Sequence, residues 1–156
     1  MKIAYINPTT IIRRPIAELA NIFSKKHSVT VFTPKTFYNK QLNSHYNFNK
    51  KVHIKKYQTI NFIKSMEWPI PINPSFLFEL HKIFRNNDIV HMWTYSYLVN
   101  FFALLYSKFY KTKLILTYDT VPGISLSVGK FDYAYKIFYF VFSKFIFKNS
   151  DEVSVY

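Results

Sequence analysis

The chain of 156 residues is long enough for one domain that buries roughly two-thirds of the surface its unfolded form exposes. Its hydrophobic content of 49% excludes a disordered chain, and the lack of cysteine excludes a disulfide framework and a thiolate metal site. The formal net charge is +13, and residues 19–66 contain no acid, which implies an anionic partner: nucleic acid, a phosphorylated substrate or an anionic lipid surface. A composition biased towards lysine and aromatic residues throughout the genome is the alternative explanation.

The N-terminal segment does not have the pattern of a signal peptide. Its apolar stretch, Lys2–Asn7, is short, and two threonines and two arginines soon follow it. The expected location is therefore the cytoplasm, and the positive charge extends that expectation to the inner face of a membrane.

Hydrophobic periodicity in the first half of the chain predicts three strands. Lys2–Asn7 is an apolar strand, and Pro15 fits the first turn of a helix with apolar residues at helical spacing. A second strand follows at Val29–Thr33. A third strand, nearer a sheet edge, is predicted at Val52–Tyr57, after a polar loop over Pro34–Lys50.

The second half begins with a stiff connector, because Trp68–Pro74 contains three prolines. Helices and strands then alternate, in the order helix Ser75–Arg85, strand Asp88–Met92, helix Ser96–Tyr110, strand Lys113–Tyr118, helix Phe131–Lys148 and strand Asp151–Val155. This alternation predicts a single α/β domain with a doubly wound, mostly parallel, Rossmann-like sheet. In such sheets ligands bind beyond the carboxyl ends of the strands, where the strand order reverses.

The segment NPTTIIRRP, after the first strand, carries the first candidate site. Arg13 and Arg14 lie beside the expected start of the first helix, whose free N–H groups favour an anion, and guanidinium groups suit a phosphate or carboxylate. Thr9 and Thr10 share this loop and belong to the same candidate substrate site. Two solvated arginines are the alternative interpretation. The glycine fingerprint of dinucleotide sites and the Walker loop are absent, which disfavours a nicotinamide or ATP site.

The segment HMWTY, at the expected end of the fourth strand, carries two further candidates. His91 suits the orientation of a hydroxyl or proton transfer, and a structural histidine is the alternative. Trp93 offers a flat face for a sugar ring or a lipid.

The loop after the fifth strand contains both glycines of the chain, Gly123 and Gly129, which suggests close approach to a ligand. Asp119 lies at its start, beside Tyr118, as a candidate catalytic carboxylate. An Asx turn or a helix cap is the alternative. No second carboxylate accompanies Asp119, and no H-x-x-H or D-x-D grouping indicates a metal site.

The last predicted helix is apolar over most of its circumference, with Lys136, Lys144 and Lys148 among aromatic residues. Lysines mixed with aromatics on an outward face favour contact with an anionic membrane surface. Lys136 and Lys144 interrupt the apolar run too often for a transmembrane helix. Burial against another domain is the competing interpretation.

Three stretches, taken in order and with their spacing, resemble the N-terminal domain of family-4 glycosyltransferases of the GT-B fold. They are MKIAYINP with RRPIAELANIFSKKHSVTVFTP, then PINPSFLFELHKIFRNNDIVHMW, then KTKLILTYDT with KNSDEVSVY. The resemblance covers nearly all of residues 1–156. It implies that the donor-binding C-terminal domain of that family is missing here, and is either truncated from this chain or encoded separately.

The resemblance implies the acceptor-binding half of a glycosyltransferase. Such an enzyme transfers a sugar from a nucleotide-sugar donor to a lipid-linked or glycan acceptor, without a further cofactor or a required metal. Asp119 and His91 would face the transferred sugar, and Arg13 with Arg14 would receive an acceptor or donor anion. The implied partner is a donor-binding domain or chain.

The sequence also departs from that family. Residues 9–12 replace the usual glycines of the first loop, and Tyr118 with Asp119 replaces the usual histidine. A catalytically inactive module that docks on a membrane or a protein is therefore the alternative. Nucleic-acid binding through residues 25–64 is disfavoured, because a basic face without a motif is usually solvated or lipid-facing. Flavodoxin-like and receiver-like domains share the sheet, but their phosphate loop and acidic cluster are absent here.

Overall fold

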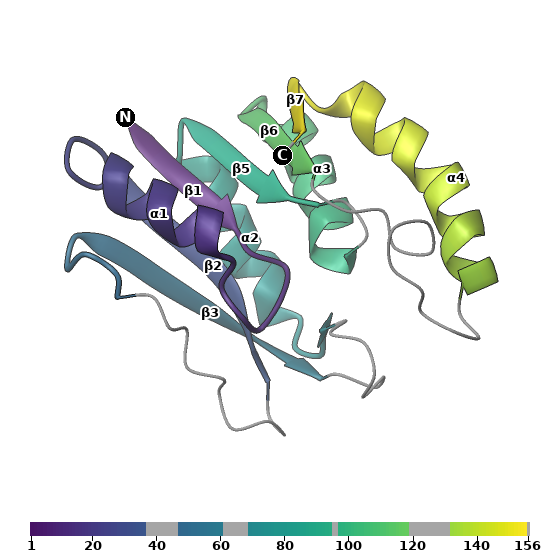
Figure 1. The fold of residues 1–156 in the computed structure, drawn as a ribbon, viewed down its shortest axis with the longest axis horizontal. Coiled ribbons are helices and arrows are strands. Elements are labelled where there is room, and N and C mark those ends of the chain that lie inside the picture. The colour runs from purple at the N-terminus through teal and green to yellow at the C-terminus, as the bar shows by residue number, and fades with distance from the viewer. Residues whose placement is uncertain (37–46, 61–68, 95–96, 119–131, 156) are drawn as a thin grey trace.

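The computed structural model describes residues 1–36, 47–60, 69–94, 97–118 and 132–155, and Figure 1 shows how their helices and strands are arranged. The strands are β1 (Lys2–Ile6), β2 (Ser28–Thr36), β3 (Val52–Ile60), β4 (Ile70–Pro71), β5 (Ile89–Trp93), β6 (Lys113–Tyr118) and β7 (Glu152–Val155). The helices are α1 (Arg14–Phe23), α2 (Ser75–Asn86), α3 (Leu98–Tyr110) and α4 (Asp132–Asn149).

The strands form a sheet in the order β4-β3-β2-β1-β5-β6-β7, in which every neighbouring pair is parallel except β3 and β4. The chain moves outward from β1 to β2 and β3, and then returns to the other side of β1 to add β5, β6 and β7. The strand order therefore reverses between β1 and β5. This confirms the doubly wound, Rossmann-like α/β sheet that the alternation of strands and helices predicts.

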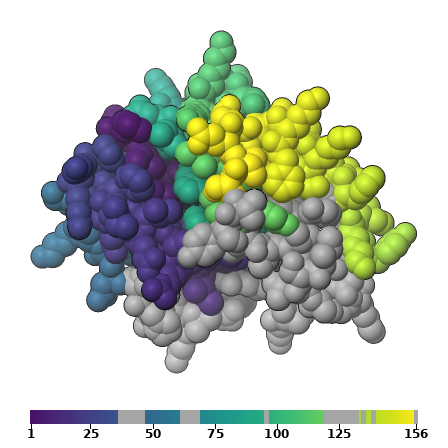
Figure 2. Space-filling view, turned by 45° about the horizontal axis from the view of Figure 1, so that its top comes forward, coloured from purple at the N-terminus to yellow at the C-terminus, as the bar shows by residue number. Residues whose placement is uncertain are grey.

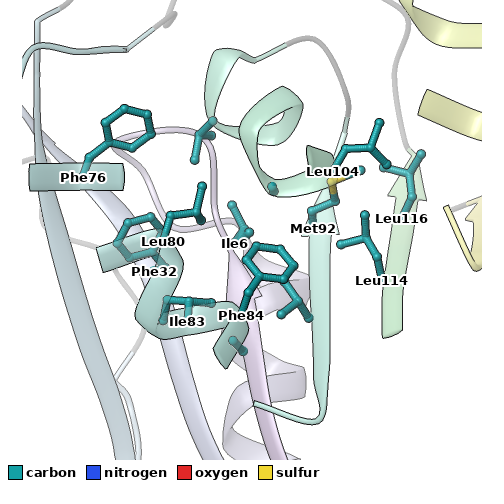
Figure 3. Packing of buried hydrophobic residues seen from close by; sticks show 14 of the residues in the cluster. Ile6, Phe32, Phe76, Leu80, Ile83, Phe84, Met92, Leu104, Leu114 and Leu116 are labelled. Carbon is teal, nitrogen blue, oxygen red and sulfur yellow. The ribbon is translucent and has the colours of Figure 1, made fainter. Parts of the chain in front are cut away.

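Alternate side chains of β1 enter two separate cores. Ala4 and Ile6 join the larger core, which α2, α3 and α4 cover, whereas Ile3 and Tyr5 join a smaller core beneath α1. Figure 3 shows the larger core, where apolar side chains of β1, β2, β5 and β6 pack against α2 and α3. Because both faces of β1 are buried, Ile3–Ile6 is an uninterrupted apolar run.

Strand β2 is longer than the sequence predicts. Pro34 was expected to begin a loop, yet the strand continues to Thr36. Pro34 pairs with Tyr57 of β3, while β1 ends opposite Phe32. Beyond Phe32, β3 is the strand that pairs with β2 in the described sheet. The side of β2 that faced β1 then forms no ladder, so the N–H that proline lacks is not needed there.

The connector predicted at 68–74 contains the short strand β4, which pairs antiparallel with the end of β3 at the sheet edge. An edge strand tolerates proline, because one of its sides forms no ladder. The other predicted elements are present, with boundaries that differ by up to three residues. None of the described helices has the length and apolar character needed to cross a membrane.

Substitution of Leu80 by Ala is expected to destabilise the fold by about 2–5 kcal/mol, because its side chain is fully buried in the larger core and truncation leaves a cavity. Phe78 lies on the same helix with 69% of its surface exposed, so Phe78→Ala is the matched control and is expected to cost less than about 0.5 kcal/mol. Chemical denaturation measures both values. Equal losses for the two variants would contradict the placement of α2.

Candidate functional site at the carboxyl edge of the sheet

The strand order places two chain segments side by side at the carboxyl edge of the sheet. The loop from β1 to α1 leaves on one side of the reversal point, and the chain leaves β5 at Thr94 on the other side. Asn7 follows β1 directly, and Thr94 follows β5 directly, and both residues are buried. This is the position at which open α/β sheets bind ligands.

Asn7 organises the loop between β1 and α1. Its Nδ2 group lies within hydrogen-bond distance of three acceptors: the carbonyl oxygens of Thr9 (2.5 Å) and Ile11 (3.2 Å), and Thr33 Oγ1 (3.0 Å). Its Oδ1 atom accepts from the backbone N–H of Arg13 at 3.4 Å. One fully buried amide thus ties the loop to itself, to β2 and to the start of α1.

The two threonines of this loop have different surroundings. Thr9 is 4% exposed, and its hydroxyl donates to the carbonyl oxygen of Ile11 at 2.7 Å. Thr10 is half-buried. In this structure Thr9 therefore stabilises the loop internally, and the more accessible Thr10 is the better placed of the two to contact a ligand.

The two arginines at the start of α1 also differ. Arg13 is the N-cap residue, with extended backbone angles, and its side chain is half-buried. The first turn of α1 contains no acidic residue, so the guanidinium group adds to the positive end of the helix dipole. Arg14 is exposed, and its Nε donates to Glu18 Oε1 at 2.7 Å. Such an exposed pair contributes about 0–1 kcal/mol, so an anion can compete for Arg14 at little cost.

The end of β5 is held in an unusual conformation. Thr94 has a φ angle of 57°, in the left-handed region, which costs a β-branched residue about 1–2 kcal/mol. Its N–H donates to the carbonyl oxygen of Thr117 (2.7 Å), and its own carbonyl accepts from Asn100 Nδ2 (2.6 Å). Asn100 Nδ2 also donates to the carbonyl of Trp93 at 2.9 Å, whereas its buried Oδ1 atom has no hydrogen-bond partner among the residues that the structure describes. The first turn of α3 therefore fixes how the chain leaves β5.

His91 lies within β5, as it does within the predicted strand Asp88–Met92, and the observed strand ends one residue later, at Trp93. It pairs with Tyr5 in β1 and with Ile115 in β6, so β5 continues two residues beyond it. Side chains alternate between the two faces of the sheet along β5, with His91 and Trp93 on the face that α1 covers. The histidine ring lies 5.4 Å from that of Tyr5 and 5.3 Å from that of Trp93, centroid to centroid.

A row of hydrogen-bonding side chains crosses the sheet from His91. His91 Nε2 and Thr117 Oγ1 are 2.6 Å apart, and Thr117 Oγ1 and Ser154 Oγ are 2.7 Å apart, so the row links β5, β6 and β7. Burial lowers the pKa of His91 to about 4, because desolvation disfavours the charged ring. Near neutral pH the ring is uncharged, so it can orient a hydroxyl but is a weak proton acceptor.

The remaining candidates are placed as follows. Trp93 is 2% exposed and packs in the core beneath α1, so its ring does not offer the open face expected from the sequence. Tyr118, the last residue of β6, is half-buried, and its ring meets that of Phe147 edge to face at 5.7 Å. Asp119 and Gly123 lie outside the described residues.

The sequence analysis assigned no role to Thr33, Asn100 and Thr117, and it included Asn7 and Thr94 in the candidate segments NPTTIIRRP and HMWTY without a role of their own. These are small polar residues within or beside apolar segments, and their partners lie up to 37 residues away in the chain. The available signal was an asparagine directly after an apolar strand, a residue that often fixes a turn. Within the described ranges, no three histidine or acidic side chains come together as metal ligands.

The comparisons with known proteins agree with the fold. No family model matches the sequence, and no curated protein matches it. A solved structure described as a Rossmann-fold NAD(P)-binding family protein from Shigella flexneri is similar, with a TM-score of 0.54 and 14% sequence identity. The match covers 99% of this chain and 66% of that one. At this identity the likeness shows the Rossmann-like fold alone.

Replacement of Asn7 by Ala is expected to destabilise the protein by about 2–4 kcal/mol, because it leaves buried acceptors of the β1–α1 loop without a donor. Asn86, the exposed last residue of α2, provides the control, and Asn86→Ala is expected to change stability by less than about 0.5 kcal/mol. Urea denaturation tests both. A loss for Asn7→Ala no larger than that of the control would show that the network contributes little.

His91 is expected to make stability depend on pH. Its pKa is about 4 in the folded state and near 6.5 when unfolded, so below pH 6.5 the unfolded chain binds more protons and stability falls with pH. Between pH 7 and pH 5 the loss attributable to His91 is about 2 kcal/mol. His91→Gln keeps a polar group beside Thr117 but does not titrate, so this variant should lose about 2 kcal/mol less than the wild type over the same interval. Parallel curves for the two proteins would contradict the assignment.

Proposed function

We propose that this chain is the acceptor-binding half of a glycosyltransferase. In this proposal it works with a donor-binding domain, in the same polypeptide or in a separate one. The transferred sugar comes from a nucleotide-sugar, and the acceptor is a lipid-linked molecule or a glycan. The acceptor or donor anion lies at the carboxyl edge of the sheet, between the β1–α1 loop and the end of β5.

The observation that carries this proposal is the position of Arg13. Arg13 is half-buried and is the N-cap residue of α1, which follows β1 at the point where the strand order reverses between β1 and β5. A helix N-terminus without acidic residues and a cation at such a point together favour a phosphate or pyrophosphate group. The resemblance of the sequence to family-4 glycosyltransferases spans the same elements, and it is the reason for proposing a sugar as the transferred group.

The fold neighbour raises the question of a dinucleotide, because its description names NAD(P). In dinucleotide sites a glycine-rich turn lets the pyrophosphate approach the backbone closely. Here the corresponding loop has no glycine, and Asn7 and Thr9 fill its interior with their own hydrogen bonds. We therefore place the anion near the side chain of Arg13, outside the loop, and expect no tight binding of NAD(P).

A catalytically inactive docking module is the second candidate. It is favoured by the state of His91, which is uncharged near neutral pH and hydrogen-bonded to Thr117 within the sheet. Asp119 then becomes the decisive residue, since it is the remaining candidate for a catalytic carboxylate. The two candidates differ in one measurable property, donor-dependent sugar transfer.

Arg13→Gln is expected to lower the kcat/KM of sugar transfer about 10- to 100-fold, the effect of losing one charge-assisted hydrogen bond to an anion. The assay uses the chain expressed together with its donor-binding partner, sought in the reading frame downstream of codon 156 or in a neighbouring gene, and a panel of labelled nucleotide-sugars. Arg85 is exposed in the last turn of α2, at the opposite edge of the sheet, and Arg85→Gln should change kcat/KM less than about twofold.

Asp119→Ala in the same assay tests the proposed catalytic carboxylate, and unchanged transfer would remove Asp119 from the mechanism. Equal activity of the Arg13 and Arg85 variants would contradict the proposed anion site. Absence of transfer with every donor, in the presence of a folded donor-binding partner, would select the docking module.

A further inference from the structure

Helix α4 has a fixed inward side. Ile146 is fully buried in the larger core and Ser143 is 7% exposed, which places both residues on the inner side of the helix. Phe142 packs edge to face against Phe101 of α3, and Phe147 does the same against Tyr118 of β6. Because these contacts hold α4 from one side, the opposite side is presented outward.

The outward side is apolar and basic. Its exposed residues recur at intervals of three and four, so they form one stripe along the helix; they are Tyr133, Lys136, Ile137, Phe140, Val141, Lys144, Phe145 and Lys148. Exposure reaches 82% for Phe140 and 76% for Tyr133. The sequence from Tyr133 to Asn149 contains no acidic residue. Figures 1 and 2 show α4 on the flank of the molecule.

The neighbouring helix repeats this combination. On α3, Leu105 is 44% exposed and Phe109 is 77% exposed, while Lys108 and Lys111 are exposed at the end of the same helix. Helices α3 and α4 cover the same face of the sheet. An apolar surface of this extent, on a chain with a net charge of +13, indicates an interaction site whose partner is negatively charged.

We propose that the outward stripe of α4 docks on an anionic lipid bilayer, with the helix axis parallel to the membrane surface. The apolar residues Tyr133, Ile137, Phe140 and Val141 enter the boundary between headgroups and acyl chains, which removes their surface from water. The aliphatic stems of Lys136, Lys144 and Lys148 lie along the same stripe and carry their ammonium groups to lipid phosphates. This inference stands independently of sugar transfer.

A bilayer fits this stripe better than a protein partner does. Five apolar side chains and three lysines alternate along it without a single acid, whereas an interface core between proteins is depleted of lysine. Lysine chains can extend from an apolar surface to charged headgroups, so the stripe satisfies both parts of a lipid interface at once.

The test measures partition of the full chain onto vesicles of phosphatidylcholine alone and of phosphatidylcholine with roughly one-third phosphatidylglycerol. Binding is expected to the anionic vesicles and to weaken at high salt. The triple variant Lys136→Gln, Lys144→Gln, Lys148→Gln should bind roughly 100-fold more weakly, about fivefold for each lysine near the surface. Phe140→Ser should weaken binding about tenfold, through lost apolar burial.

Matched controls lie on the opposite face of the sheet, at α1 and nearby. Lys25→Gln, Lys26→Gln and Lys51→Gln together remove the same charge from exposed positions, and Ile22→Ser removes an exposed apolar side chain. These controls should keep vesicle binding within about threefold of the wild type. Circular dichroism and thermal unfolding test whether all variants are folded. We expect them to be folded, because every substituted residue is exposed.

Three outcomes would overturn the proposal. The first is that the wild type does not bind anionic vesicles. The second is that the α4 and α1 variants lose binding equally, which indicates adsorption by net charge. The third is that the wild type self-associates through α4 in sedimentation experiments and does not bind vesicles. That result would show that a second copy of the chain covers the outward stripe of α4. Because vesicle binding needs no sugar donor, its failure is separable from failure of the transferase assay.

Discussion

The fold depends on the burial of β1 from every side. Its backbone pairs with β2 on one edge and β5 on the other, and its side chains enter both cores. A shift of β1 by one residue would exchange the side chains that enter the two cores. The register of β1 therefore fixes the positions of the neighbouring strands along the strand direction. The ends of β1 and β5 therefore meet at one level, and the positions of Asn7, Arg13 and Thr94 follow from that single strand.

The candidate site is built on buried amides rather than on flexible glycine. Asn7 closes the β1–α1 loop and attaches it to β2, and Asn100 of α3 holds the end of β5 at Trp93 and Thr94. In the proposed function, such an edge would bind a ligand through outward side chains, Arg13 above all, because the polar backbone groups of the loop already have partners. This distinguishes the chain from a phosphate-binding turn, in which the backbone itself is the ligand.

Local pattern was sufficient to predict most of the fold, because strands such as Lys113–Tyr118 and helices such as α2 carry a strong period and clear end signals. It was insufficient where a neighbour decides the outcome. Pro34 continues a strand because β1 has already ended, and β5 extends one residue beyond its predicted end at Met92. The site was harder still, since the partners of Asn7 and His91 are brought together only by the sheet.

The strand order also has a consequence for synthesis. Strand β1 obtains its second neighbour only when β5 is complete, and the chain must first add β2, β3, β4 and α2 on the other side. Two hydrogen bonds between Lys2 and Asp88 close a loop that spans more than half of the sequence: the Asp88 N–H donates to the Lys2 carbonyl, and the Lys2 N–H donates to the Asp88 carboxylate. Until residues 89–93 leave the ribosome, an apolar strand edge in the centre of the future sheet stays open. Long-range parallel pairing of this kind is expected to slow folding and to leave the nascent chain exposed to aggregation.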